Sequence, residues 1–126
     1  MRIEHIAIWV QDLETMKDFY QKYFKGTASE LYYNKQTGFK SYFIKFTDGS
    51  RLEIMTRPDI KKVKTGNFLG YAHISISLGS KESVDKYTEK FEANGYSIMS
   101  KPRTTGDGYY ESTILDPEGN LIELTV

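Results

Sequence analysis

Apolar and polar positions alternate in several short stretches of the chain and recur with helical spacing in two longer ones. Residues 2–10 and 71–78 alternate and are rich in β-branched side chains, which predicts a strand in each place. Behind each strand, apolar residues recur on one helical face, after Asp12 in the first case and after Ser80 in the second. Both residues are favoured helix N-caps, so a helix should follow each strand.

Three more strands are expected after each of these helices. Gly26 and Gly95 mark the predicted ends of the helices. Turns rich in Gly, Asn and Asp separate the alternating stretches that come next, as hairpins require. The predicted strands are 28–33, 39–47 and 51–56 after the first helix, and 96–101, 109–115 and 121–126 after the second. The order is therefore βαβββ, twice, which is an α+β fold.

The two halves of the chain repeat one pattern. The sequence HIAI at 5–8 returns as HISI at 73–76, an offset of 68, while Glu53 matches Glu123 at an offset of 70. An insertion of two residues between the matching blocks accounts for the difference. We expect one domain, residues 1–126, built from the repeat units 1–60 and 69–126 and joined by a linker loop at 57–70.

Strand alternation places two histidines and two glutamates on the mixed faces of the predicted strands, opposite uniformly apolar faces that should pack on the helices. The chain has only two histidines, and His5 and His73 occupy equivalent positions, as Glu53 and Glu123 do. Each could be an ordinary strand residue. If the units meet about a twofold axis, however, the four side chains converge, and a cation removes the several kcal/mol that their clustering would cost. The repeat therefore predicts a metal site.

Two imidazoles and two carboxylates suit Zn, Ni, Co, Mn or Fe(II), and they do not suit Cu(I) or a dedicated calcium site. Four protein ligands could close a tetrahedral structural site. In a wide cleft they would instead leave one or two positions for water or substrate, as a catalytic site requires.

Composition excludes several other classes of protein. The chain carries 17 Lys and Arg against 17 Asp and Glu, which argues against nucleic acid or an anionic membrane as the main partner. There is no cysteine, so disulfides, thiolate metal sites and a cysteine nucleophile are excluded. No apolar run approaches the ~20 residues of a membrane span, and no signal-peptide pattern opens the sequence. We expect a soluble, cytoplasmic domain.

The doubled βαβββ pattern, the HIAI and HISI strands and the ending DPEGNLIEL resemble the vicinal oxygen chelate superfamily over the whole chain. This superfamily contains glyoxalase I, extradiol dioxygenases, methylmalonyl-CoA epimerase, fosfomycin-resistance proteins and bleomycin-binding proteins. The resemblance implies a curved mixed sheet around a metal-binding cleft. It also implies a homodimer, with each metal site built either within one chain or across two. The order His, Glu, His, Glu is most similar to bacterial glyoxalase I, the lactoylglutathione lyase.

Carried over by position, the resemblance makes His5, Glu53, His73 and Glu123 the metal ligands. It implies a lyase in which a carboxylate near the metal takes a carbon-bound proton from a hemithioacetal and the metal stabilises the enediolate. Zn or Ni is the expected ion, with Mn, Co or Fe as further candidates. By analogy Glu123 is the base and Glu53 its counterpart on the other side of the metal, although position alone does not fix which glutamate does what.

The chain departs from glutathione-using members of the family, because it has Trp9 where they commonly carry an arginine, and Arg57 near the place of an asparagine. The identity of the thiol in the substrate is therefore left open. The expected substrate contacts on the cleft face are Trp9, Met55, Tyr71 and Tyr110, with Arg51, Arg57, Lys101 and Arg103 as candidate grips for an anion. Two other readings remain: a different metal chemistry, such as ring-cleaving dioxygenation or thiol transfer to an epoxide, and a non-enzymatic module that sequesters a planar ligand.

Overall fold

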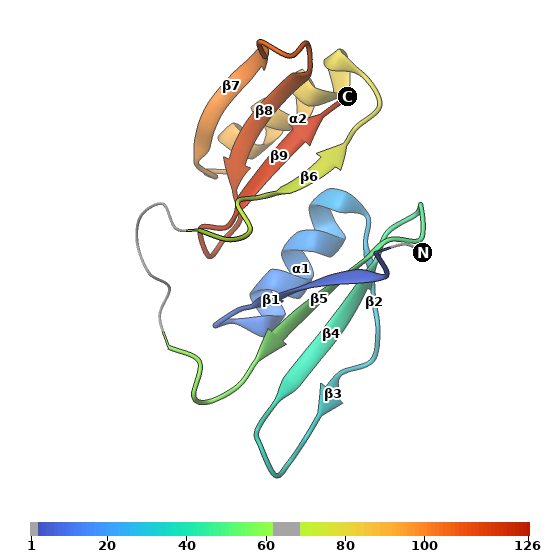
Figure 1. Ribbon diagram of the computed structural model, residues 1–126, viewed down its shortest axis with the longest axis vertical. Helices are drawn as coiled ribbons and strands as arrows, with labels where there is room; N and C mark the ends of the chain where they lie inside the picture. The colour runs from blue at the N-terminus through green and yellow to red at the C-terminus, as the bar shows by residue number, and fades with distance from the viewer. Residues whose placement is uncertain (1–2, 62–68) are drawn as a thin grey trace. The chain divides into compact units, whose positions relative to one another are not determined.

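The structure, a computed structural model, describes residues 3–61 and 69–126 and divides into two compact units, Met1–Thr65 and Gly66–Val126 (Figure 1). The division falls inside the predicted linker 57–70, whose residues 62–68 lie outside the described part.

The predicted order of elements is confirmed in both units. Unit 1 contains β1 (His5–Trp9), α1 (Leu13–Phe24), β2 (Thr27–Ala28), β3 (Tyr32–Tyr33), β4 (Lys40–Lys45) and β5 (Arg51–Thr56). Unit 2 contains β6 (Ile74–Ser77), α2 (Lys81–Ala93), β7 (Ile98–Thr104), β8 (Tyr110–Leu115) and β9 (Leu121–Thr125). Among the described residues, neither helix is long and apolar enough to cross a membrane.

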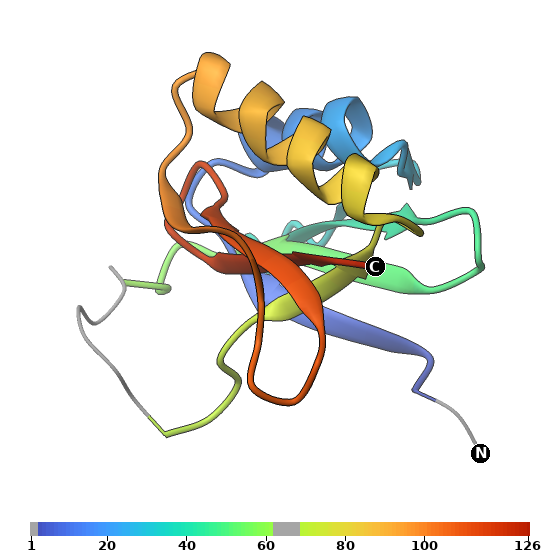
Figure 2. The same ribbon diagram turned by 90° about the horizontal axis from the view of Figure 1, so that it is seen from above.

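Both sheets are mixed and share one topology. In unit 1 the strand order is β1-β5-β4-β2, with β3 also paired to β4, and in unit 2 it is β6-β9-β8-β7. The first strand of each unit runs parallel to the last: Ala7 lies beside Glu53 in one sheet, and Ser75 beside Glu123 in the other. These partners differ by the same offsets, 68 and 70, that relate the two halves of the sequence. Figure 2 shows that α1 and α2 each cover one face of their own sheet.

The predicted single strand 28–33 is instead two short strands, β2 and β3, separated by three residues. Ser29 explains the interruption, because its side-chain oxygen accepts a hydrogen bond from the backbone N–H of Phe43 at 3.0 Å. A side chain thus takes the place of one backbone partner in the ladder, and regular pairing resumes only at Tyr32.

The expectation that the apolar face of strand 2–10 packs on a helix holds only at its end. Ile6 is 39% exposed and Ile8 is half-buried, while Val10, just past the strand, is buried. The reason is that β1 is an edge strand bonded only to β5, whereas α1 packs on β2, β4 and β5. The apolar core of unit 1 therefore lies under the centre of its sheet, and β1 contributes little to it.

The helix starts and ends agree with the sequence, since Gly26 and Gly95 lie just past α1 and α2. Asp12 and Ser80 accept hydrogen bonds from the backbone N–H groups of Thr15 and Ser83, as N-caps do. The left-handed residue at the end of α1 is Lys25, with φ of 55°, and not Gly26. Gly26 is required for a different reason: a Cβ there would lie 2.3 Å from the side chain of Ile44, which is fully buried.

Gly26→Ala should therefore lower the free energy of unfolding by about 1–3 kcal/mol, the usual cost of forcing extra volume into a packed core. Urea denaturation would measure the change. The matched control is Gly106→Ala, since no described heavy atom lies within 4 Å of a Cβ built there, and it should shift stability by less than about 0.5 kcal/mol. Equal denaturation midpoints for the two variants would contradict this account of Gly26.

Candidate metal centre

In unit 1 the predicted ligands His5 and Glu53 are neighbours on the face of the sheet away from α1. His5 opens β1, Glu53 lies on the adjacent parallel strand β5, and the imidazole Nε2 is 3.8 Å from a carboxylate oxygen of Glu53. The side chain of Glu53 is 15% exposed and that of His5 is 36% exposed. The pair thus lies at the surface of unit 1, where an ion can reach it.

Three side chains around His5 fix the orientation of its ring. Glu4 bonds to the imidazole Nδ1, and Phe43 meets the ring edge-on with centroids 5.2 Å apart. Arg51 stacks 4.2 Å above the Phe43 ring and forms an ion pair with Glu4. The hydrogen bonds from Arg51 and from His5 lower the pKa of Glu4 from 4.5 to about 2, so Glu4 is a carboxylate at neutral pH.

Unit 2 contains the equivalent pair with different surroundings. The Nε2 atom of His73 is 3.6 Å from a carboxylate oxygen of Glu123, on β9. Ser75, the register partner of Glu123 on the parallel strand β6, donates a hydrogen bond of 2.6 Å to the other carboxylate oxygen. In unit 2 the carboxylate is held by a neighbour, whereas in unit 1 it is the imidazole that is held.

A third acid, which the sequence interpretation missed, lies beside Glu123. Burial, and then the hydrogen bond and charge of the Glu123 carboxylate, raise the pKa of Glu111 above its ordinary value. Arg103 approaches the same side chain, with 3.2 Å between a guanidinium nitrogen and a Glu111 oxygen. The sequence pattern does not indicate Glu111, because only the strand register, in which Thr113 lies beside Glu123, puts Glu111 on the same face.

The two pairs fit a divalent cation in chemistry and spacing. Two ligand atoms that are each about 2.1 Å from a tetrahedral ion are about 3.4 Å apart. The observed separations of 3.8 Å and 3.6 Å are close to this value, and imidazole with carboxylate is a set that Zn, Ni, Co, Mn and Fe(II) accept. Within residues 3–61 and 69–126 each unit brings together one His–Glu pair, and no group of three or more His, Asp or Glu side chains that could hold a metal occurs there.

The predicted substrate contacts of unit 1 lie on the same sheet face as His5 and Glu53. Trp9 is the register partner of Met55 and is 41% exposed. Its indole meets Phe39 edge-on at 6.1 Å, and Phe39 in turn lies 5.9 Å from the ring of Tyr32. The sequence interpretation missed Phe39 and Tyr32, because they belong to a neighbouring hairpin whose register only the fold fixes. These rings form an aromatic cluster at the far end of β1 from His5.

The structure separates the predicted contacts of unit 2 from one another. The prediction that Tyr110 shares a face with Glu123 is wrong: its hydroxyl bonds to Asp85 of α2 at 2.7 Å, which puts it on the helix side of the sheet. Lys101 also reaches α2, where it pairs with Glu92. Arg103 is on the Glu123 side through Glu111, and Tyr71 is fully exposed ahead of β6.

All four predicted anion grips already pair with a carboxylate of their own unit. Arg51 bonds to Glu4, and Arg57 bonds to Asp59 while its guanidinium lies 5.4 Å from the Trp9 ring. Lys101 and Arg103 are paired as described above. Each positive charge is therefore balanced nearby, and an incoming anion would have to compete with a carboxylate for it.

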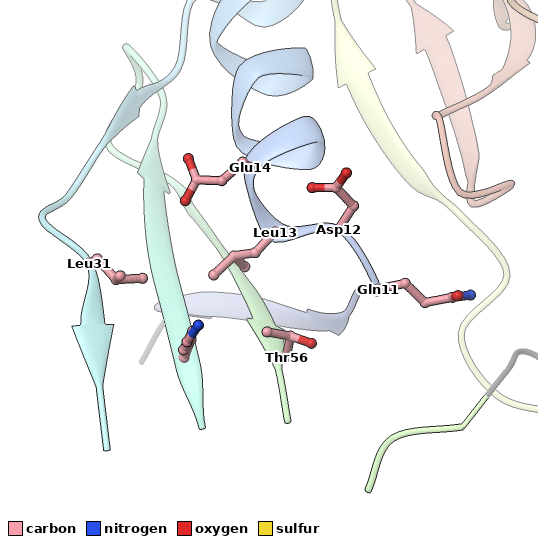
Figure 3. A pocket seen from close by; sticks show the side chains of 7 residues that line it. Gln11, Asp12, Leu13, Glu14, Leu31 and Thr56 are labelled. Carbon is pink, nitrogen blue, oxygen red and sulfur yellow. The ribbon is translucent and has the colours of Figure 1, made fainter. Parts of the chain in front are cut away.

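A shallow pocket of about 390 Å³ in unit 1 is a separate feature (Figure 3). Thr56, which lines it, is on the helix side of β5, so the sheet separates the pocket from His5 and Glu53. Glu14 in this pocket is engaged by the hydroxyl of Tyr42 at 2.8 Å and by Lys17. The lining residues are Gln11, Asp12, Leu13, Glu14, Leu31, Lys40 and Thr56. The pocket is not part of the candidate metal centre.

Comparison with known proteins gives the family. The model of the Glyoxalase/Bleomycin resistance protein/Dioxygenase superfamily matches residues 2–124, and the chain belongs to this superfamily. Its sequence is 26% identical over 129 residues to the uncharacterised protein YqjT of Bacillus subtilis, and the match covers 97% of this chain and 96% of that protein.

Solved structures show the same fold. Glyoxalase I from Zea mays superposes with a TM-score of 0.81 at 21% identity over 98% of this chain. The match covers 44% of the maize chain, so the protein described here spans less than half of that length. The fosfomycin resistance protein FosX from Listeria monocytogenes, solved with Mn(II) and sulfate, superposes with a TM-score of 0.74 at 23% identity over 99% of this chain and 91% of its own.

Proposed function

We propose that the protein is a metal-dependent lyase or isomerase of the glyoxalase I type, acting on a small adduct of a 2-oxoaldehyde and a thiol. One observation supports this above all: each unit carries a histidine and a glutamate at the same place in the same register, 3.8 Å and 3.6 Å apart. Membership of the superfamily, whose relatives in fold include glyoxalase I and the Mn(II)-containing FosX, adds to it.

In this proposal His5, Glu53, His73 and Glu123 together hold one divalent ion, Zn or Ni in the first place and Mn, Co or Fe otherwise. When bound, the ion supplies Lewis-acid polarisation of the substrate oxygens. Glu123 takes the proton from the carbon that bears the hydroxyl and the sulfur and returns it to the former carbonyl carbon, while the hydroxyl proton passes to the former carbonyl oxygen, so no proton is gained or lost overall. Ser75 keeps one oxygen of Glu123 in place and leaves the other facing His73. Glu53 has the corresponding position in unit 1.

The thiol in this proposal carries no carboxylate, and it is not glutathione. The reason is that Arg51, Arg57, Lys101 and Arg103 are each balanced by a carboxylate within their own unit. What the sheet face of unit 1 offers beyond the His–Glu pair is instead Met55, Trp9 and the aromatic rings beside it. An uncharged, apolar thiol substituent suits such a surface.

The test is turnover of methylglyoxal by protein loaded with Ni, Co or Zn, in the presence of glutathione, 2-mercaptoethanol or benzyl mercaptan. We expect isomerisation of the adducts of the uncharged thiols, followed by ultraviolet absorbance, at a higher kcat/KM than with glutathione. No turnover with any thiol, despite a filled metal site, would overturn the proposal. Consumption of catechols with Fe(II), or opening of the fosfomycin epoxide with Mn(II), would show that the protein catalyses a different reaction of the superfamily.

The aromatic cluster of Trp9, Phe39 and Tyr32 favours a second candidate, a non-enzymatic protein that sequesters a planar ligand. Trp9 and Tyr32 are 41% and 57% exposed, so ligand stacking would bury rings that now face solvent. Quenching of the fluorescence of Trp9, the only tryptophan, measures such binding. Equal affinity with and without metal, together with no turnover, would favour this candidate over the lyase. The homodimer and the cytoplasmic location stay predictions.

A further inference from the structure

The side chains that surround the two histidines differ between the units at several positions that the repeat relates. Unit 1 places Glu4, Phe43 and Arg51 around His5. At the equivalent positions unit 2 has Ala72, Thr113 and Leu121, and the first and last of these have no polar side-chain atom. Unit 2 instead bonds its carboxylate through Ser75, where unit 1 has Ala7. The duplication has therefore kept the two His–Glu pairs and changed which member of each pair is supported.

The contacts of His5 define which of its two nitrogens carries hydrogen. A carboxylate can only accept, so the imidazole donates from Nδ1 to Glu4. In the neutral ring, the other nitrogen, Nε2, then has a free lone pair, and it is Nε2 that lies 3.8 Å from Glu53. The arrangement leaves a lone pair, and not an N–H, on the side of the ring where the second candidate ligand stands.

We propose that Glu4 is a positioning residue for His5: held by Arg51, it fixes the ring and its tautomer so that Nε2 is ready to bind a divalent cation. This inference rests on the proposed function in taking His5 as a metal ligand. A carboxylate that accepts from the far nitrogen of a ligating histidine both orients the ring and increases its basicity. Arg51 matters because its ion pair keeps the Glu4 side chain, 51% exposed, from turning into solvent.

Among residues 3–61 and 69–126 no carboxylate supports the far nitrogen of His73, so the two histidines contribute unequally. His5 meets the ion with its ring already oriented. The ring of His73, whose equivalent of Glu4 is Ala72, must become ordered when the ion binds. Glu4 should accordingly contribute to metal affinity even though it touches only the ligand and not the ion.

The test compares Glu4→Ala and Glu4→Gln with the wild-type protein. Dissociation constants for Ni and Zn are measured by competition with a chromogenic chelator at one fixed pH. We expect Glu4→Ala to weaken binding by about 10- to 100-fold, the usual effect of removing such a partner. Glu4→Gln should weaken it less, because an amide oxygen still accepts from Nδ1. The matched control is Glu30→Gln, which removes an exposed carboxylate of the same unit and should leave affinity unchanged.

A second readout needs no metal. Nitrogen-15 NMR of the metal-free protein should show His5 with hydrogen on Nδ1 in the wild type and a mixture of tautomers in Glu4→Ala. Hydrogen on Nε2 in the wild type, or unchanged metal affinity in Glu4→Ala, would overturn the inference. A wild-type protein that binds no metal would instead contradict the proposed function. In that case, loss of the Nδ1–H tautomer in Glu4→Ala would still support the conclusion that Glu4 orients the His5 ring.

Discussion

Replacing His73 by alanine is expected to weaken metal binding by more than 10-fold, so that the purified variant contains little of the metal found in wild-type protein. The reason is that losing a ligand should cost at least as much as losing a partner that only supports one. The Nε2 atom of His73 is the imidazole donor that unit 2 places 3.6 Å from Glu123. Elemental analysis of both proteins, purified in the same way, measures the change.

Two further variants complete the comparison. His5→Ala should lose at least as much metal, because His5 has the equivalent place in unit 1 and its ring is already held by Glu4. Glu89→Ala, which removes an exposed carboxylate on α2, should keep the wild-type metal content. Equal metal in wild type and His73→Ala would remove the basis for every catalytic role proposed here.

Replacing Glu123 by glutamine is expected to lower kcat by about 10²- to 10⁴-fold, the typical contribution of a positioned general base. An amide oxygen can still approach a cation, but it cannot take a proton from carbon. Glu53→Gln should cost less, since Glu53 acts in the proposal as a ligand on the other side of the ion. Single-turnover rates with saturating metal separate the chemical step from metal loss.

Glu111→Gln is the control for this second comparison, because it removes an acid that bonds to Glu123 and leaves Glu123 itself in place. It should change kcat much less than Glu123→Gln. If Glu53→Gln proved the more damaging substitution, the base would be Glu53. If neither glutamine variant slowed turnover, proton abstraction by these carboxylates would be excluded.

Sequence alone was enough to predict the architecture, because its signals are local and periodic. The N-caps Asp12 and Ser80, the alternation of β1 and β6 and the repeat offsets of 68 and 70 each report on a few neighbouring residues, and all agree with the structure. The same alternation put the four candidate ligands on the mixed faces of their strands. The parallel pairing of the first and last strand of each unit, which the sequence did not predict, brings His5 near Glu53 and His73 near Glu123.

Predictions failed where strand register or packing decides the outcome. Tyr110 faces α2, because the turn from Asp116 to Asn120 sets which face of β8 lies beside Glu123. Ile6 is exposed, because β1 is an edge strand that α1 does not cover. The hydrophobic pattern of a single strand predicts neither the face of Tyr110 nor the exposure of Ile6. The pattern has the same period in an edge strand as in a central strand of a sheet.

The sequence by itself determined the duplicated βαβββ fold and the identity of the four candidate ligands. Only the tertiary structure decided what surrounds them: Glu4 and Arg51 at His5, and Ser75 and Glu111 at Glu123. The physical reason is the separation along the chain between the residues that interact. Periodicity, caps and turns are encoded by residues close in the chain, whereas the partners of a side chain come from other strands, and their distance is set when the sheet forms.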